Sequence, residues 1–352
     1  MALTVQIQKR YGNFLLNVDF TAESGQALAL LGASGCGKSV TLRCIAGVDK
    51  PDRGRIALDG QVLFDSEAGV NLPPRKRRVG FLFQSFALFP HMTVERNVAV
   101  CLGSLEKRRR RARTAELLAL LHLEEQAELY PRQLSGGQQQ RAALARILAA
   151  EPRALLLDEP FSALDSFLKW QLEQELREVL DRFPGPVVWV SHDRGEVCRN
   201  CPRVCVLEAG ASAPVTTMAE LMSRPGTVGA ARLSGCRNYA SLRPGPGPGL
   251  VEVPEWGLIL EAAAPWREGA STLGIRADRV HPAEAGEANS FFCQVLWVVE
   301  DASVILAALR PEDAVPGAPP LWMELCRDAW AALPDRERLP AAIRPEDLML
   351  LE

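Results

Sequence analysis

The sequence lacks any apolar run near the roughly 20 residues that span a bilayer. Its amino terminus also lacks the basic and then apolar pattern of a secretory signal peptide. The sequence also lacks an excess of charge of either sign, because the 352 residues carry a formal net charge of only −3. These absences argue against an integral membrane protein and against a strongly polyanion-binding one. They predict a cytoplasmic protein whose partners depend on local features.

Regular cysteine spacing is also missing. Nine cysteines without a repeated spacing indicate reduced thiols, so we expect no disulfides. Cys198, Cys201 and Cys205 form a C-x-x-C-x-x-x-C group, but no fourth Cys or His follows at the spacing of a metal site. The pattern around Val204 to Leu207 is that of a buried strand, where Cys serves as a small apolar residue. Core thiols are favoured over a metal site.

The first 65 residues contain two alternating patterns of apolar and polar residues. The opening stretch predicts two antiparallel strands joined near Tyr11 and Gly12. RIALDGQVLFD, from Arg55 to Asp65, predicts a hairpin that turns at Asp59-Gly60. Both suggest a small antiparallel sheet beside a parallel one.

A glycine-rich loop follows the first continuous apolar run. Ala27 to Leu31 has the pattern of a buried parallel strand, and GASGCGKS, Gly32 to Ser39, leads from it into a helix closed by Gly47. Strand, loop and helix are the context that the phosphate-loop pattern G-x-x-x-x-G-K-[ST] requires. Backbone N–H groups would cradle phosphates, while Lys38 would reach the β and γ phosphates and Ser39 would bind Mg²⁺. A chance Gly-rich turn is the disfavoured alternative.

The stretch from Leu134 to Asp165 has the order of a second site. It begins with the glycine-rich turn LSGGQ, continues as an amphipathic helix, and becomes an apolar run that stops at Asp158 and Glu159. Adjacent residues at a strand end point in different directions. Asp158 can therefore hold a metal while Glu159 polarises a water.

Two further strands end in polar residues. VGFLFQ ends at Gln84, which could reach the metal or the attacking water, and the strand Pro186 to Val190 ends in Ser191-His192-Asp193. Ligands of open α/β sheets bind at the carboxyl ends of the strands. The phosphate loop, the acid pair and His192 are therefore predicted to converge on one pocket.

Two surface stretches have alternative interpretations. Phe86 to Val98, FALFPHMTVERNV, is unusually apolar and could be either a partner-docking loop or a core-filling turn. The basic run Lys107 to Arg113 precedes a helix whose acids offset its charge, and no aromatic residues interleave to stack on bases. We interpret the run as a solvated helix start and expect no nucleic-acid partner.

Beyond Gly210 the character of the sequence changes. PGPGPG, Pro244 to Gly249, is a turn-rich loop, and the short alternating strands around it predict a small β-barrel. Gly274 to Val280 and Ala342 to Leu348 share a partial repeat, I-R-x-x-[DR]. A barrel built from two related halves is the inference.

Six motifs in order resemble those of ABC transporter ATP-binding subunits: the phosphate loop at Gly32, Gln84, LSGGQ at Leu134, LLLDEP at Leu155, SALD at Ser162 and SHD at Ser191. They cover about two thirds of the chain, and LSGGQ separates this family from other phosphate-loop ATPases. The resemblance implies an α/β fold. A phosphate-loop ABC ATPase domain with a mixed sheet would span residues 1–232, with a helical subdomain at about 85–150. A small regulatory β-barrel of the OB or TOBE-like type would span residues 233–352.

The resemblance also implies a homodimer in which each ATP lies between the phosphate loop of one copy and LSGGQ of the other. Glu159 would act as the base, with Gln84 sensing metal and water and His192 contacting the γ-phosphate. Ser39, Gln84 and Asp158 would bind Mg²⁺. The residues implied to bind nucleotide are Tyr11 (stacked on adenine), Gly32, Ala33, Ser34, Gly35, Cys36, Gly37, Lys38, Ser39, Val40, Ser135, Gly136, Gly137, Gln138 and Asp165, the last at the dimer seam.

In this family the stretch after Gln84 implies a docking surface for importer permeases. The chain would be a peripheral subunit at the cytoplasmic face of the membrane, with integral permease subunits and a periplasmic or extracellular binding protein as partners. LPPRKRRVGFLFQ and LSGCRNYA, at Leu233, are similar to molybdate subunits, so we expect molybdate as the solute. Sulfate, another anion, a sugar or a polyamine are the alternatives.

Two observations bear on these expectations. The barrel lacks a clear T-S-A-R-N start of a molybdate-binding repeat, for which Ala288-Asn289-Ser290 is at best a remnant. The barrel could still sense an anion and regulate the ATPase. A soluble ABC ATPase acting on DNA or ribosomes is disfavoured, because the chain has neither a second ATPase half nor a long coiled-coil insertion.

Overall fold

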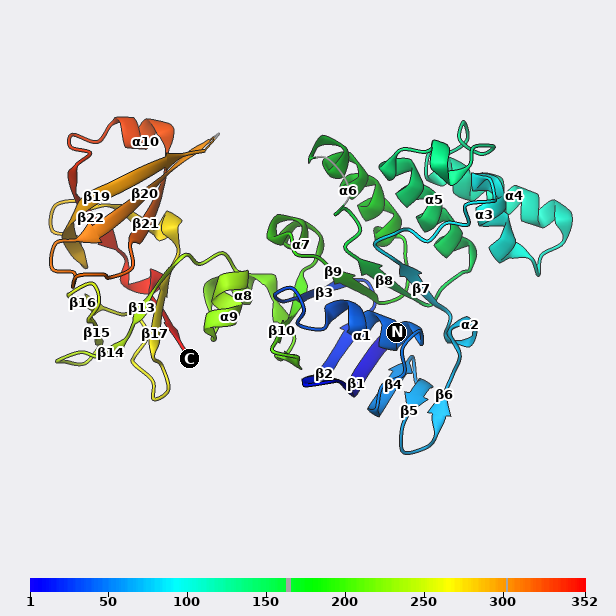
Figure 1. The fold of residues 1–352 in the computed structure, drawn as a ribbon, viewed down its shortest axis with the longest axis horizontal. Coiled ribbons are helices and arrows are strands. Elements are labelled where there is room, and N and C mark those ends of the chain that lie inside the picture. The colour runs from blue at the N-terminus through cyan, green and yellow to red at the C-terminus, as the bar shows by residue number, and fades with distance from the viewer. Residues whose placement is uncertain (163–165, 302) are drawn as a thin grey trace. The chain divides into compact units, whose positions relative to one another are not determined.

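The computed structural model describes residues 1–162, 166–301 and 303–352. The chain divides into two compact units, Met1–Met218 and Ala219–Glu352 (Figure 1). Asp165, the residue expected at a dimer seam, lies outside the described residues. Within the described part of the chain, every helix is too short or too polar to cross a membrane.

A mixed sheet forms the centre of the first unit, in the order β6-β5-β4-β1-β2-β11-β10-β3-β9-β8-β7. Its antiparallel half contains β1 (Ala2–Tyr11), β2 (Phe14–Glu23), β4 (Arg53–Leu58), β5 (Gln61–Asp65) and β6 (Val70–Asn71). Alternate side chains of β1 are buried, as the sequence pattern predicts. Asp59 and Gly60 both have positive φ, as the tightest hairpin turns require. The predicted antiparallel sheet is therefore present.

The parallel half of the sheet positions the functional residues. It consists of β10 (Arg203–Glu208), β3 (Ala27–Leu31), β9 (Val187–Val190), β8 (Ala154–Asp158) and β7 (Val79–Leu82), each parallel to its neighbour. β8 and β9 are buried along their whole length, as expected for strands covered on both faces. Because the strands are parallel, their carboxyl ends lie at one edge. The short strands β11 (Ala211–Ser212) and β12 (Thr216–Thr217) pair with β10.

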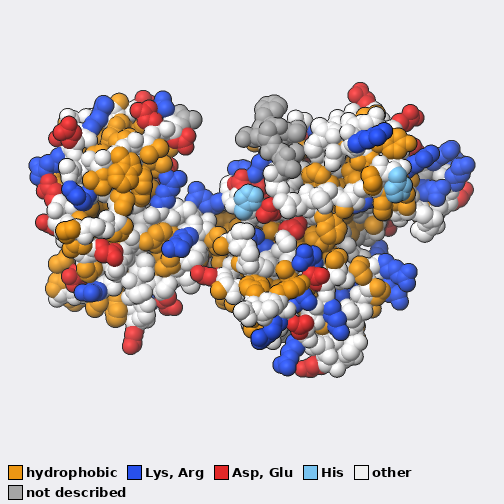
Figure 2. Space-filling view, in the orientation of Figure 1, with side chains coloured by type: hydrophobic (Ala, Val, Ile, Leu, Met, Phe, Trp, Pro, Cys, Tyr) orange, Lys and Arg blue, Asp and Glu red, His pale blue; other side chains and the backbone are white. Residues whose placement is uncertain are grey.

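Helices α3 (Val94–Ala99), α4 (Lys107–Leu120) and α5 (Gly136–Ala149) lie within the predicted helical subdomain. Leu117 and Leu118 are the buried apolar residues of α4, whereas Lys107 and the arginines that follow it are mostly exposed. Figure 2 shows Lys and Arg side chains gathered over the outer end of this helix. The other helices of this unit are α1 (Lys38–Ala46), α2 (Pro74–Arg77), α6 (Ser166–Asp181) and α7 (Arg194–Asn200), with 3-10 turns η1 (Val100–Leu102) and η2 (Pro131–Gln133).

The second unit contains a nearly closed five-strand antiparallel barrel, which confirms the predicted barrel. Its strands are β18 (Val280–Pro282), β22 (Arg338–Ile343), β19 (Ser290–Glu300), β20 (Val304–Pro311) and β21 (Leu321–Cys326), in that order. Two three-strand sheets accompany it: β13 (Asn238–Ser241), β17 (Thr272–Ile275) and β23 (Met349–Leu351), and β14 (Arg243–Pro244), β15 (Leu250–Val253) and β16 (Leu258–Glu261). Trp256, Leu273 and Met323 belong to one shared core.

The two sequence repeats occupy equivalent positions in this unit. Each forms a strand, a 3-10 turn and a second strand: β17, η3 (Ala277–Arg279) and β18 in one repeat, and β22, η4 (Pro345–Asp347) and β23 in the other. β17 pairs with β23, and β18 pairs with β22. The register is the same in both pairs, because Gly274 opposite Met349 corresponds to Ala342 opposite His281. An approximate two-fold axis thus relates the repeats.

The first compact unit ends at Met218, whereas the domain boundary expected from the sequence lies at residue 232. The intervening helices α8 (Met218–Ser223) and α9 (Val228–Leu233) explain the difference. Val228 and Ala231 pack in one cluster with Met349 and Leu351 of the last strand. This packing assigns α9 to the second unit, although the strand it contacts is more than 100 residues away in the chain.

Candidate active site

The phosphate loop forms a cradle between β3 and α1. Gly35 and Gly37 have φ of +80° and +105°, values that L-residues rarely adopt. Gly32 has a different constraint, since a Cβ there would lie 2.3 Å from the carbonyl oxygen of Leu207. Lys38 Nζ donates to the carbonyl oxygens of Gly32 at 2.7 Å and Ala33 at 3.0 Å, so its charge lies across the loop.

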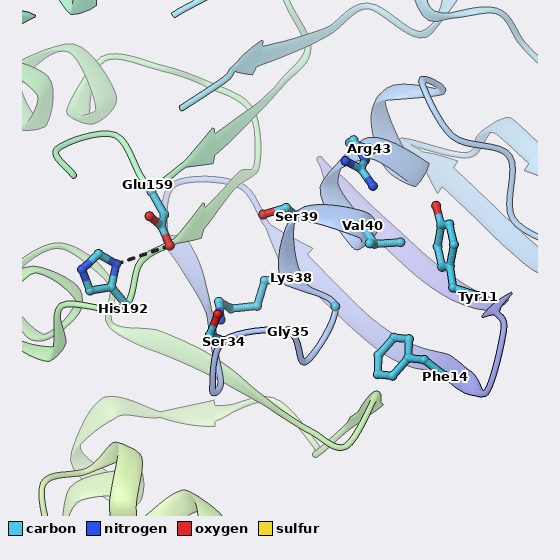
Figure 3. Close-up of a pocket in the computed structure, with 11 residues that line it drawn as sticks. Tyr11, Phe14, Ser34, Gly35, Lys38, Ser39, Val40, Arg43, Glu159 and His192 are labelled. Carbon is cyan, nitrogen blue, oxygen red and sulfur yellow. Dashed lines mark ion pairs between the residues drawn. The ribbon is translucent and has the colours of Figure 1, made fainter. Parts of the chain in front are cut away.

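The loop opens into a cavity of about 490 Å³, drawn in Figure 3. The walls consist of Tyr11, Phe14, Ser34, Gly35, Gly37, Lys38, Ser39, Val40, Arg43, Glu159 and His192. Aromatic residues lie at one end, the cationic loop in the middle, and the polar strand-end residues at the other. This distribution suits a ligand with a flat base and a phosphate chain.

Tyr11 is held at the aromatic end by contacts that the sequence did not predict. Its hydroxyl donates to Asp49 Oδ2 at 2.8 Å, and Arg43 Nε donates to the same oxygen at 2.9 Å. Lys9 Nζ lies 4.8 Å from the centre of the Tyr11 ring. Partial burial, together with the hydrogen bond to Asp49, raises the pKa of Tyr11. Asp49 follows the helix after the phosphate loop, so no motif marks it; Phe14 had a signal in its position beside the predicted turn.

Ser39 and Asp158 bring a hydroxyl and a carboxylate together beside the phosphate loop. Ser39 Oγ donates to Asp158 Oδ1 at 2.9 Å. Burial raises the pKa of the Asp158 carboxyl; the Ser39 hydrogen bond opposes this shift, and nearby Glu159 adds to it. A hydroxyl and a carboxylate are oxygen ligands of the kind that Mg²⁺ prefers, and this ion usually completes its shell with water and substrate phosphates. These two residues therefore fit Mg²⁺.

Glu159, Gln84 and His192 come together from the ends of three adjacent strands. Glu159 Oε1 lies 3.3 Å from His192 Nδ1, and Gln84 Nε2 donates to Glu159 Oε2 at 3.3 Å. The backbone of Glu159 has a φ of +49°, uncommon for a residue with a side chain and typical of functional positions. The backbone N–H of Glu159 donates to the carbonyl oxygen of Val190 at 2.9 Å, which fixes this turn. The structure thus brings together the strand-end residues that the sequence singled out.

The LSGGQ residues have a different location. Ser135 is the N-cap of α5, and Ser135 and Gln138 form reciprocal side-chain to backbone hydrogen bonds of 3.3 and 2.9 Å, a capping box. The described residues that line the nucleotide cavity do not include Ser135, Gly136, Gly137 or Gln138. These residues therefore do not contact the same copy's phosphate loop through this cavity.

The three clustered cysteines differ in their exposure. Cys201 and Cys205 are buried, and burial raises the pKa of Cys205 to about 12. Among the described residues, no group of three or more His, Cys, Asp or Glu side chains is arranged so that it could hold a metal ion. The interpretation as core thiols therefore fits Cys201 and Cys205, while Cys198 is exposed.

Comparison with known proteins agrees with this geometry. A family model described as "ABC transporter" matches residues 15–162. The probable sulfate/thiosulfate import ATP-binding protein CysA of Chlorella vulgaris is 43% identical over 227 residues, which are 63% of this chain and 94% of that protein. CysA of Synechococcus elongatus is 43% identical over 63% of this chain and 64% of its own length. The chain thus spans slightly under two thirds of this second relative.

Solved structures lead to the same family. The dimeric bacterial ABC transporter cassette MJ0796 is 32% identical, with a TM-score of 0.53, over 62% of this chain and 99% of the cassette. A second structure of that cassette, in a post-hydrolysis state, is bound to ADP and Pi. The sheet, the phosphate cradle, the converging strand ends and these likenesses have one explanation: the chain belongs to the ABC transporter family, as one of its ATPase subunits.

Proposed function

We propose that the chain hydrolyses ATP to drive import of an oxyanion, sulfate or thiosulfate. The observation that supports ATP hydrolysis is that the side chains of Gln84, Glu159 and His192 lie close together beside the phosphate cradle. The solute is inferred from relatives at 43% identity, which are named for sulfate and thiosulfate import. They favour the sulfate alternative over the molybdate expected from LPPRKRRVGFLFQ and LSGCRNYA, two short local likenesses.

Each group in the cradle has a role in phosphoryl transfer, where the enzyme mainly supplies position and charge. Loop N–H groups and Lys38 hold the phosphate oxygens. Ser39 and Asp158 would hold Mg²⁺, which would supply charge neutralisation when bound. Gln84, which donates a hydrogen bond to Glu159, would sense the metal and the attacking water. Glu159 accepts a proton from the attacking water. At the same time the water oxygen bonds to the γ-phosphorus, and the bond between the γ-phosphorus and the leaving oxygen of ADP breaks. His192 orients the transferred phosphate.

A second copy would complete the site. LSGGQ begins a 14-residue helix whose N-terminal N–H groups favour an anion, and it lies outside the lining of this copy's nucleotide cavity. The solved cassette that resembles this chain is dimeric. A homodimer would place Ser135 and Gly137 of each copy against the γ-phosphate held by the other, so hydrolysis would require dimer closure.

The permease would dock on the segment from Phe86 to Val98. Phe86 is buried, whereas Phe89 is 41% exposed, so the loop both fills the core and presents an apolar surface. Asn97 Nδ2 donates to the carbonyl oxygens of Phe89, Met92 and Thr93, each at 3.1 Å, and thereby shapes the exposed part. Such a surface suits an integral permease. It would place the chain at the cytoplasmic face of the membrane as a peripheral subunit.

Uptake by cells that lack this chain tests the solute. We expect uptake of labelled sulfate by these cells to fall at least tenfold and molybdate uptake to stay unchanged. Expression of the wild-type chain should restore sulfate uptake, whereas expression of the Lys38→Ala variant should not. A loss of molybdate uptake with normal sulfate uptake would contradict the proposed solute and leave the ATPase assignment intact.

A further inference from the structure

A lysine joins the helix after the acid pair to the helix after His192. Lys169 of α6 places Nζ 2.5 Å from Asp193 Oδ2 and 3.0 Å from Glu196 Oε2 of the α7 region. It lines a second, polar cavity of about 230 Å³, whose wall also includes Glu159 and His192. Lys169 therefore lies beside the catalytic groups without being part of the nucleotide cavity's lining.

Glu196 depends on this lysine because it is almost completely buried. Only 3% of its side chain is exposed, and its other oxygen accepts a 2.7 Å hydrogen bond from Trp189 Nε1. Burial raises the pKa of Glu196, while the hydrogen bonds from Lys169 and Trp189 oppose the shift. Removing one partner of a buried ion pair leaves an uncompensated charge. Without Lys169, the first turn of α7 would have to move or take up a proton.

Asp193 transmits this constraint to its neighbour. Its Oδ1 accepts from the backbone N–H of Glu196 at 3.1 Å, and its own N–H donates to Ser191 Oγ at 3.0 Å. The residues on both sides of His192 are therefore fixed, whereas the His192 side chain is 67% exposed. Its position opposite Glu159 thus depends largely on the backbone that Asp193 and Ser191 hold.

We propose that Lys169 is a positioning residue for His192: it fixes Asp193 and Glu196, and so holds the imidazole beside Glu159 and the γ-phosphate. The inference rests on the proposed role of His192. Loss of Lys169 would leave two carboxylates in the first turn of α7 without their shared cation. Their repulsion would displace His192, and a displacement of about 1 Å can lower a rate by roughly 100-fold.

The chain provides a matched control in a second ion pair between the same helices. Arg199 Nε and Nη2 donate to the two oxygens of Glu173 at 2.7 and 2.9 Å, and Glu173 is fully buried. Arg199 lies in the last turn of α7, and its direct ion pair is with Glu173. Both ion pairs join α6 to α7, but Lys169 makes the direct ion pairs with Asp193 and Glu196, whereas the charge of Arg199 acts on these two carboxylates from a greater distance.

Single-turnover ATP hydrolysis and ATP affinity should be measured on the full chain for Lys169→Met, Lys169→Arg, Arg199→Met, His192→Ala and Lys169→Met with His192→Ala. We expect Lys169→Met to be roughly 10- to 100-fold slower with ATP affinity within about twofold, and Lys169→Arg to recover most of the rate. Arg199→Met should lose stability yet keep most of its rate per folded molecule. In the His192→Ala background, Lys169→Met should cause no further loss.

A further pair keeps the test valid if Lys169→Met folds poorly. Lys169→Met with Glu196→Gln removes the buried unpaired charge, so it should fold, yet Asp193 still lacks its cation and the rate stays low. A normal rate in this pair or in Lys169→Met, an equal loss in Arg199→Met, or independent losses with His192→Ala would overturn the proposal. Normal hydrolysis by His192→Ala alone would instead refute the proposed role of His192.

Discussion

At the scale of single residues, the site combines groups that the motifs marked with groups that only the fold brings together. Lys38, Asp158, Glu159 and His192 each lie at or shortly after the carboxyl end of a buried strand, so their convergence could be predicted from the sequence. The contact of Asp49 with Tyr11 could not, because it joins two segments 38 residues apart through their side chains. The positive φ of Glu159 also has no signature in the sequence.

The Tyr11 ring should contribute to ATP affinity more than to the rate of hydrolysis. Stacking of a base on an aromatic ring is worth about 1–3 kcal/mol. We expect Tyr11→Ala to weaken ATP binding by roughly 5- to 150-fold in a nucleotide titration, with little change in kcat in a steady-state hydrolysis assay. Tyr11→Phe keeps the ring and loses the hydrogen bond to Asp49, so it should stay near wild type; equal losses in both variants would argue against stacking.

The ionised carboxylate of Asp158 should lower the free energy of unfolding of the chain when nucleotide and metal are absent. Its pKa is raised on folding, so the stability linked to its protonated form is fully present below the pKa of the unfolded chain and is lost as pH rises through the folded value. Asp158→Asn should therefore raise the melting temperature at pH 7, with the gain vanishing below pH 4.

Hydrolysis that depends on Mg²⁺ should at the same time fall by about 100-fold or more, because the amide is a poorer ligand than the carboxylate. Thermal unfolding at both pH values and a Mg²⁺ titration of activity measure the two effects. A destabilised Asp158→Asn variant at pH 7 would contradict the account.

At the scale of elements, Arg146 links the LSGGQ helix to the segment that follows Gln84. Its guanidinium donates to the carbonyl oxygens of Ala87 at 2.6 Å and Phe86 at 3.3 Å, and lies 5.2 Å from the centre of the Phe89 ring. Phe86 and Ala87 both have positive φ, so this turn is strained and needs such support. The sequence predicted the loop and the helix but left open whether the loop docks or fills the core, because side-chain burial at a turn depends on the neighbouring helix.

Arg146→Met should destabilise the first unit by about 2 kcal/mol, since hydrogen bonds to charged groups are lost from a partly buried site. Urea unfolding measures this loss, and limited proteolysis should show faster cleavage between Phe86 and Val98. Arg132→Gln, at an exposed position before the same helix, is the control. Wild-type stability and unchanged cleavage in Arg146→Met would show that this contact does not hold the loop.

At the scale of the whole molecule, the alternating strands beyond residue 232 were sufficient to predict a barrel. The repeated I-R-x-x-[DR] segments do not form two halves of it, because each repeat contributes one strand to the barrel and one to a separate three-strand sheet. The sequence could not assign α9, because the assignment depends on packing against a strand at the end of the chain. Nor could it separate sulfate from molybdate, because the residues of the ATP site need not touch the transported solute. The central claim of the proposed function is therefore an ATP site in which the acid pair would serve the copy's own phosphate loop and LSGGQ would serve a partner.

The most direct test of this claim is Glu159→Gln, assayed for ATP binding, dimer mass with ATP, and hydrolysis. The substitution keeps the shape and removes the base, so ATP binding should stay within about threefold and hydrolysis should fall roughly 100- to 10,000-fold. ATP should then hold the variant as a stable dimer, whereas Glu124→Gln, at an exposed position, should behave as wild type. Hydrolysis by Glu159→Gln at a near-normal rate, or a variant that stays monomeric with ATP bound, would contradict the account.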